Sequence, residues 1–211
     1  MRQGRLPRPP AAGWHTLAAV RTPVVVREIG LAGFLASLDP MVGIYAAAMD
    51  PDPADLPGRR HIMQRHASYP GFRALAVSAA DDGPMIAFAY GFHGEAGQWW
   101  HDVVLAGMTG QCGYQRASAW MIDVMEVAEV HVHPGYQRQG IGRDMLLALT
   151  AGRSERTAVL STRDADSTAR RLYRRLGFTD VLTGYSFPGA GPPYAVMGAV
   201  LPLAETAAAP S

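Results

Sequence analysis

The sequence predicts an α/β protein built around a mixed β-sheet. Short apolar or β-branched runs, which are typical of strands, alternate along the chain with segments whose apolar residues recur at helical spacing. The turn signal Asp81-Asp82-Gly83 separates two of these runs, as in a β-hairpin. The 211 residues are the length of one ordinary domain and suffice to bury a full core.

The expected strands are short runs of apolar and β-branched residues. They comprise residues 24–28, 73–78, 85–92, 121–132, 157–162, 178–187 and 194–200. All of them fall within residues 21–203, which we expect to form one domain because no internal repeat is evident. Residues 1–20, rich in Pro, Arg and Gly, are expected to be a disordered or irregular arm, and 204–211 a tail.

The expected helices lie between these strands. They comprise residues 34–49, broken by Pro40, then 59–67, a helical turn over 99–105, and 141–150, with Met145, Leu146 and Leu149 on its apolar face. A last helix is expected to have Asp166 as its N-cap and to end at Gly177, the residue type that most often follows a helix.

The composition argues against several classes of partner. A formal net charge of +1 gives no reason to expect nucleic acid or an anionic membrane surface as partner. No stretch of the sequence approaches the ~18 apolar residues of a membrane span. The single cysteine, Cys112, cannot form an intrachain disulfide, and the first residues lack the apolar core of a signal peptide. We therefore expect a cytoplasmic protein.

The segment Gln-Arg-Gln-Gly-Ile-Gly, residues 137–142, carries the most information about function. It lies between a predicted strand and a predicted helix, where free backbone N–H groups form an anion site. Gly140 and Gly142 let the backbone come close to a phosphate or pyrophosphate. The chain has no lysine, which excludes a Walker A loop and Schiff-base chemistry, and Met145 breaks the G-x-G-x-x-G dinucleotide pattern.

Two blocks of sequence resemble the GCN5-related N-acetyltransferase (GNAT) superfamily. The spacing Gln-x-x-Gly-x-Gly, preceded by Val130-His-Val-His-Pro134, resembles its acetyl-CoA loop. The segment 166–178 resembles its last helix and following strand, with a polar residue, Asp166, seven before Tyr173 and a closing Leu-Gly-Phe. The resemblance covers residues 24–200 and is strongest over 125–180.

The resemblance implies a GNAT-like sheet that is mixed and mostly antiparallel, with strands four and five splayed apart and about four flanking helices. It implies acetyl-CoA as the acyl donor, with its pantetheine arm in the gap and its pyrophosphate on the loop amides. The donor-binding residues expected are Val130, His131, Val132, Gln137, Arg138, Gln139, Gly140, Ile141, Gly142, Arg143 and Asp166.

The implied activity is an N-acetyltransferase that moves an acetyl group to a primary amine by direct attack. Tyr173 matches the residue whose hydroxyl protonates the leaving thiolate. The general base remains open: Glu126 is the first choice, Glu129 and His131 follow, and proton loss to water is the alternative. In a regular strand Glu126 faces the opposite side from Glu129 and His131, and a bulge would change this.

The acceptor is expected to contact Trp99, Trp100 and His101, because the segment between the third and fourth strands borders the acceptor pocket in the family. A small-molecule amine is favoured over a protein. No metal is expected, since the spacings of His93, His101, His131 and His133 match no ligand motif. The alternative function is a non-catalytic sensor or regulatory module that binds acyl-CoA. The sequence is also compatible with a homodimer.

Overall fold

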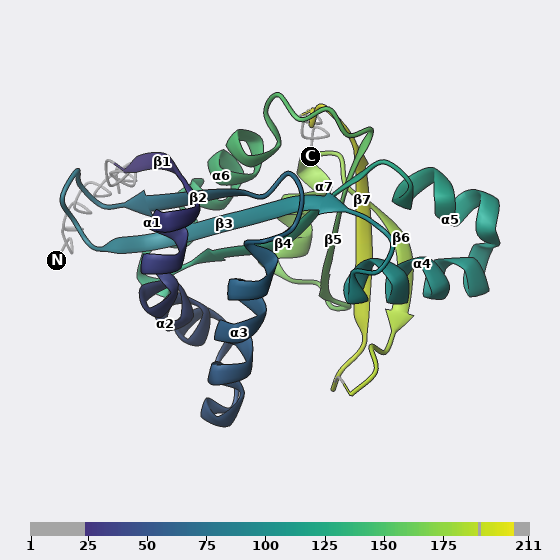
Figure 1. The fold of residues 1–211 in the computed structure, drawn as a ribbon, viewed down its shortest axis with the longest axis horizontal. Helices are drawn as coiled ribbons and strands as arrows, with labels where there is room; N and C mark the ends of the chain where they lie inside the picture. Colours follow the sequence, from purple (N-terminus) through teal and green to yellow (C-terminus); the bar gives the residue numbers. More distant parts are fainter. Residues whose placement is uncertain (1–23, 190, 205–211) are drawn as a thin grey trace, which may run out of the picture.

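The computed structural model of the chain describes residues 24–189 and 191–204, so the predicted arm, residues 1–20, and nearly all of the predicted tail lie outside the described residues. Seven strands form one sheet in the order β1-β2-β3-β4-β5-β7-β6 (Figure 1). Their bounds are β1 Val25–Ile29, β2 Arg73–Ser78, β3 Met85–Gly94, β4 Val124–Val132, β5 Thr157–Arg163, β6 Thr179–Tyr185 and β7 Tyr194–Val200. All neighbouring strands are antiparallel except β4 and β5, which confirms the mixed, mostly antiparallel sheet.

Seven α-helices flank the sheet in the described part of the chain, more than the four or so that the resemblance implies. They are α1 Leu31–Ala36, α2 Leu38–Met49, α3 Leu56–His66, α4 Trp99–Cys112, α5 Tyr114–Met121, α6 Ile141–Thr150 and α7 Thr168–Arg175, with short 3-10 turns at Pro53–Asp55 and Pro134–Tyr136. None of these helices has the length and apolarity required to span a lipid bilayer.

The expected helix over residues 34–49 is in fact two helices, and the break is not at Pro40. The helices α1 and α2 meet at Ser37, the C-cap of the first and the N-cap of the second. Pro40 lies in the first turn of α2, where its missing N–H would have had no intrahelical partner. The proline therefore follows the break.

The largest error of the sequence prediction concerns residues 99–121. They form two helices, α4 and α5, where a single turn and the start of a strand were expected. Gly107 and Gly110 lower the helix propensity of α4, but Gly107 has a packing role, since a Cβ there would lie 2.7 Å from the Tyr185 ring. Gly113, at φ 83°, separates the two helices.

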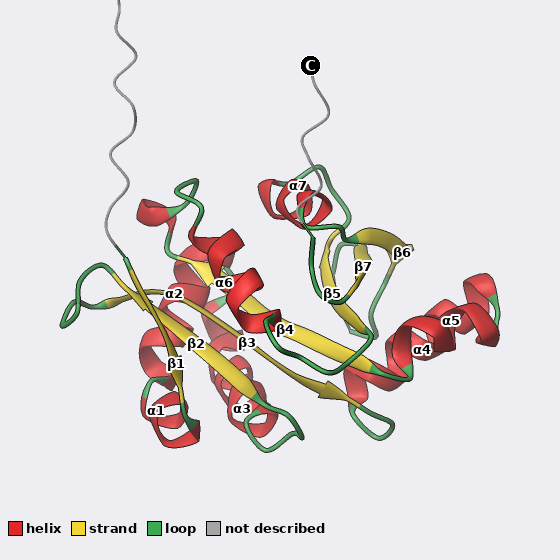
Figure 2. Ribbon diagram, turned by 90° about the horizontal axis from the view of Figure 1, so that it is seen from above, coloured by secondary structure: helices red, strands yellow, loops and turns green. Residues whose placement is uncertain are grey.

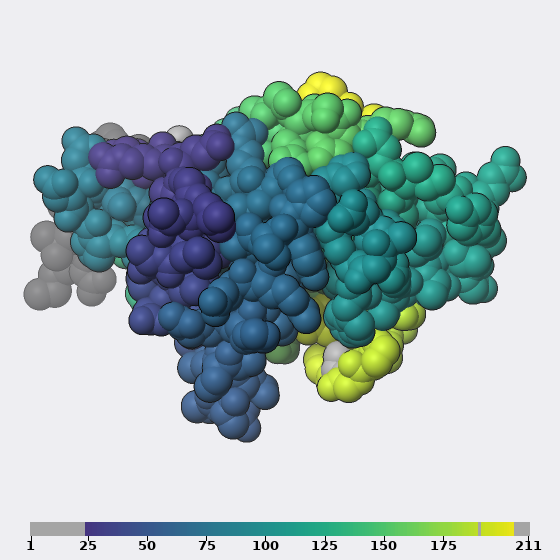
Figure 3. All heavy atoms as spheres, in the orientation of Figure 1, coloured from purple at the N-terminus to yellow at the C-terminus, as the bar shows by residue number. Residues whose placement is uncertain are grey.

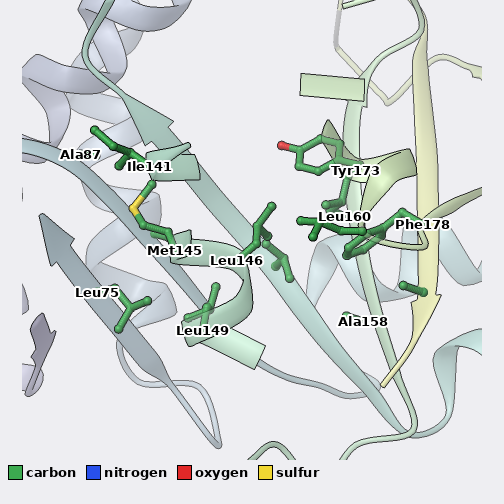
Figure 4. Close-up of a cluster of buried hydrophobic side chains, with 14 of the residues drawn as sticks. Leu75, Ala87, Ile141, Met145, Leu146, Leu149, Ala158, Leu160, Tyr173 and Phe178 are labelled. Atoms are coloured by element: carbon green, nitrogen blue, oxygen red, sulfur yellow. The ribbon is translucent and has the colours of Figure 1, made fainter. Parts of the chain in front are cut away.

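The helices divide between the two faces of the sheet (Figure 2). Helices α1–α3 cover one face over β2 and β3, with Phe34, Met41 and Met63 in their core. Helices α4 and α5 pack with β5, β6 and β7. On the other face α6 and α7 share a core that Figure 4 shows, in which Met145, Leu146 and Leu149 point from α6 toward the sheet.

The sheet splays at its one parallel pair. Strands β4 and β5 pair only over Val124–Glu126 and Thr157–Val159, at their N-terminal ends. Beyond Glu126, β4 has no strand partner on the β5 side, while its other edge stays paired with β3 as far as Val132. The splayed fourth and fifth strands are therefore confirmed.

Candidate active site

A groove with a volume of about 990 Å³ opens between α6 and α7 at the splay. One wall is the C-terminal end of β4, and the other is α7. The lining residues are Val130, Val132, Tyr136, Gln137, Arg138, Gly140, Ile141, Gly142, Arg143, Thr168, Ala169, Arg171, Leu172, Tyr173, Arg175 and Leu176. Most of the residues predicted to bind a donor therefore meet in one groove.

The loop before α6 has the backbone of an anion site. Arg138 has φ 61° and Gly140 has φ 87°, so the chain turns twice through the left-handed region before the helix begins. The side-chain amide of Gln137 donates to the Val132 carbonyl at 3.0 Å and ties the loop to β4. At Gly142 a Cβ would lie 3.3 Å from Leu172, so glycine keeps α6 close to α7. The first N–H groups of α6 then face the groove at the positive end of the helix dipole.

Three predicted donor contacts lie elsewhere. Gln139 is not among the residues that line the groove. The His131 side chain contacts Glu129 on the opposite face of β4. Asp166 is exposed and pairs with Arg171 at 2.8 Å, and the N-cap of α7 is Ser167, whose hydroxyl accepts from the Arg170 N–H at 3.1 Å. The predicted N-cap is thus wrong by one residue, because Ser167 and Asp166 are both good N-cap types.

Tyr173 extends from α7 into the groove. Figure 4 shows its hydroxyl pointing away from Phe178 toward β4, and only 8% of the residue is exposed. Burial, and then the negative charge of Glu129, raise the pKa of this phenol to about 12. The hydroxyl therefore keeps its proton at neutral pH and can act as a donor.

A second cavity, of about 460 Å³, lies on the other face of the sheet between α3 and α4. Figure 3 shows α3 and the loop between β6 and β7 on either side of a hollow at this face. The lining residues are Arg59, Ile62, Arg65, His66, Tyr69, Phe92, Gln98, Trp99, Trp100, Glu126, Val127, Ala128, Glu129, Ser161, Phe187, Pro188, Gly189 and Tyr194. We call it the acceptor-side cavity.

Glu126 lies in this cavity with an unsatisfied carboxyl group. It is 3% exposed, and its Oε1 is buried without a hydrogen-bond partner in the described structure. Burial, and then the charge of Asp102, raise the pKa of Glu126 to about 8. A carboxyl group with a pKa near neutrality and a free acceptor atom has the properties of a general base.

Glu129 is also buried, but its partners keep it ionised. Arg59 pairs with it at 2.8 Å, and the His131 imidazole contacts its other oxygen. Burial opposes ionisation, but the contacts with His131 and Arg59 outweigh it and lower the pKa of Glu129. Arg59 is itself held over the Tyr45 ring at 4.6 Å. This carboxylate is therefore a fixed negative charge.

The tryptophan segment divides between the cavity and the core. Trp99 and Trp100 line the cavity, and the Trp100 indole donates to the Ser161 hydroxyl at 3.3 Å. His101 does not line it: this imidazole is buried and lies 2.9 Å from the Met121 carbonyl. An amphipathic helix places residues 99 and 101 about 200° apart, so a single substrate wall could not include both.

Several cavity residues gave no sequence signal of function. Arg59, His66 and Tyr69 come from α3 and the turn after it, and Phe187 and Tyr194 come from either side of the last loop. The resemblance is weak before residue 70, and single aromatic residues near strands are ordinary core residues. Among the described residues, no group of three or more His, Cys, Asp or Glu could hold a metal ion.

Comparisons with known proteins agree with this architecture. The family model of the acetyltransferase (GNAT) domain matches residues 79–180. A GCN5-like protein acetyltransferase of Mycobacterium tuberculosis is 41% identical over 133 residues, which are 60% of this chain and 64% of that protein. The chain thus matches less than two thirds of the length of this curated relative.

Solved structures share the fold at low sequence identity. A structure described as a GNAT-family acetyltransferase from Desulfovibrio desulfuricans has a TM-score of 0.59 at 16% identity, over 84% of this chain and 99% of that one. An acetyltransferase structure from Salmonella typhimurium with acetyl-CoA has a TM-score of 0.53 at 18% identity, over 90% of this chain and 98% of that one. The splayed sheet and its loop define an acetyltransferase-type fold, and residues 79–180 carry the sequence pattern of the acetyltransferase (GNAT) domain.

Proposed function

We propose that the protein transfers the acetyl group of acetyl-CoA to a primary amine. One observation carries the proposal: the groove and the acceptor-side cavity lie on opposite faces of the sheet and converge at the splay. Glu129 lines the cavity and the next residue of β4, Val130, lines the groove, so the two spaces lie on either side of the same stretch of strand. A donor from one side and an amine from the other would meet there.

The groove residues fit the donor. Its loop offers backbone N–H groups to a pyrophosphate, and Arg138, Arg143 and Arg175 add positive charge along its lining. The unpaired edge of β4 at Val130 and Val132 leaves backbone groups for an amide-bearing arm to pair with, as an added strand does. When bound, acetyl-CoA supplies a thioester carbonyl for the amine to attack.

The protein residues then divide the proton transfers. Glu126 accepts the proton of the acceptor ammonium, since it lines the cavity and its pKa is raised to about 8. Glu129, held ionised by Arg59 and His131, favours the positive charge of the incoming ammonium. Tyr173 donates its proton to the departing sulfur, and its buried position excludes water from that step.

A small-molecule amine suits the enclosed size of the cavity. A protein acceptor is the second candidate, because the relative at 41% identity is named a protein acetyltransferase and because Trp99 is 51% exposed beside the cavity. A sensor without catalysis is disfavoured by the buried carboxyl group of Glu126, because burying its Oε1 without a hydrogen-bond partner is unfavourable for folding.

The test is release of free thiol from acetyl-CoA by the purified chain, with and without a panel of amines and a lysine-containing peptide. Thiol release that depends on an amine, together with the acetylated product by mass spectrometry, supports the proposal. Tight binding of acetyl-CoA with no amine-dependent release from any acceptor would establish the sensor instead.

A further inference from the structure

The walls of the acceptor-side cavity are aromatic on both sides. On the α3 side, the Phe92 ring lies 4.9 Å from His66 and 4.9 Å from Tyr69, measured between ring centroids. On the α4 side, the Phe187 ring lies 6.2 Å from Trp99 and 5.4 Å from Tyr194. All of these side chains line the cavity, so a bound molecule would lie between two aromatic surfaces.

The polar groups of the cavity leave room for one cation. Glu126 lines the cavity, and its carboxyl group has no ion-pair partner among the described residues, so it can receive an ammonium N–H. Glu129 already contacts Arg59 and His131. The pKa of His66 is lowered to about 4 by burial, so this imidazole is neutral and offers no competing charge.

The remaining charges of the lining are positive. Arg59 and Arg65 both come from α3, and Arg65 is exposed. Asp102 is near Glu126 but outside the lining, and its carboxylate accepts the Gly97 N–H at 3.0 Å. A second ammonium on the acceptor would therefore meet arginine rather than a free carboxylate.

We infer that the acceptor carries a single ammonium on an apolar stem, and that Trp99 and Phe187 set this specificity. The inference rests on the proposed acetyl transfer and names its acceptor class. A free alkylamine or arylalkylamine and the lysine side chain of a protein both offer this chemistry. Polyamines and aminoglycosides, with several cationic groups and little apolar stem, do not.

The experiment measures kcat/KM by thiol release for n-propylamine through n-hexylamine, phenethylamine, spermidine, an aminoglycoside and an N-terminally blocked peptide with one lysine. Burial of each added methylene between the aromatic walls should raise kcat/KM about fourfold along the alkyl series. Spermidine and the aminoglycoside should react at least about tenfold more slowly than hexylamine, as like charges within a cavity disfavour binding. A peptide that outperforms every free amine would assign the stem to a protein lysine.

Variants separate the aromatic contribution from general effects on the fold. Trp99→Ala should flatten the dependence on chain length, whereas Tyr114→Ala, which removes an exposed aromatic residue of α5 outside the lining, should not. Arg65→Glu should raise kcat/KM for spermidine to within a fewfold of the value for hexylamine. Rates independent of stem length, or spermidine preferred by the unaltered protein, would overturn the inference while leaving acetyl transfer intact. Failure of all acceptors would instead reject the proposed function.

Discussion

Glu126 and Glu129 point to the same face of β4, although they are an odd number of positions apart and a regular strand would put them on opposite faces. The pairing with β3 explains this, because Gly91 pairs with Val127 and Tyr90 with Glu129, which leaves Ala128 as a bulge. The two glutamates therefore line one cavity. One has its pKa raised to about 8 and the other has its pKa lowered, so adjacent carboxyl groups divide into a proton acceptor and a fixed charge.

Glu126→Gln should abolish the increase of kcat/KM with pH that depends on ionisation of this carboxyl group. If Glu126 must be ionised, kcat/KM in the unaltered protein rises with pH up to about 8 and then levels. The variant should have a lower kcat/KM, and its kcat/KM should not rise with pH below about 8. The pH profile is best measured with an alkylamine, whose own pKa of about 10 keeps it an ammonium through this range, so that only groups of the protein titrate.

Glu129→Gln is the matched control on the same face. It should keep the increase of kcat/KM with pH but destabilise the protein by about 1–3 kcal/mol, because Arg59 loses its charged partner while staying partly solvated. Urea unfolding reports the loss. A pH profile that shifts in Glu129→Gln and stays intact in Glu126→Gln would exchange the two roles.

The pKa of Glu126 also predicts how stability depends on pH. Its value rises from 4.5 to about 8 on folding, so between these values the native state holds a proton that the unfolded state has released. The free energy of unfolding should therefore decrease as pH rises through this window, by up to about 1.4 kcal/mol per pH unit. Glu126→Gln should remove this decrease, and denaturant unfolding on both sides of the window measures it.

Tyr173→Phe tests the proposed proton donor. The change removes one hydroxyl and little volume, so the core around Phe178 should survive. Under conditions where chemistry limits the rate, kcat should fall about 10²-fold or more. Calorimetry should show little change in the affinity for acetyl-CoA. An unchanged kcat would show that the thiolate leaves without help from this hydroxyl.

Gly140→Asp tests the donor groove. The new carboxylate would lie where a pyrophosphate is expected, and the residue would have to adopt φ 87° with a side chain. Binding of acetyl-CoA by calorimetry should be lost. Gly152→Asp is the control, since Gly152 has φ 68° and open space around it, just after α6. Equal affinities in the two variants would place the pyrophosphate elsewhere.

The sequence predicted the parts of the site that depend on local spacing. The loop at 137–142 leads directly into α6, and Tyr173 lies within α7, so their place in the groove followed from the resemblance. The splay of β4 and β5 followed in the same way. Each of these features depends on neighbours within one or two elements.

The features that the sequence did not predict depend on contacts between segments far apart in the chain. Whether Glu126 and Glu129 share a face depends on how Ala128 fits against β3, which no local pattern reveals. Helix α4 contains Gly107 because Tyr185 lies against it from a strand far along the chain. Such residues look unfavourable for a helix until their tertiary partner is known.

The splay has a consequence for how the molecule holds together. The backbone ladder between the β1–β4 half of the sheet and the β5–β7 half has three residue pairs and stops past Glu126. On the proposed function, a non-peptide molecule completes the interior each time it enters the groove and leaves it incomplete on departure. The native state would then alternate, once per reaction cycle, between a form in which the bound molecule links the two halves of the sheet and a form without that link.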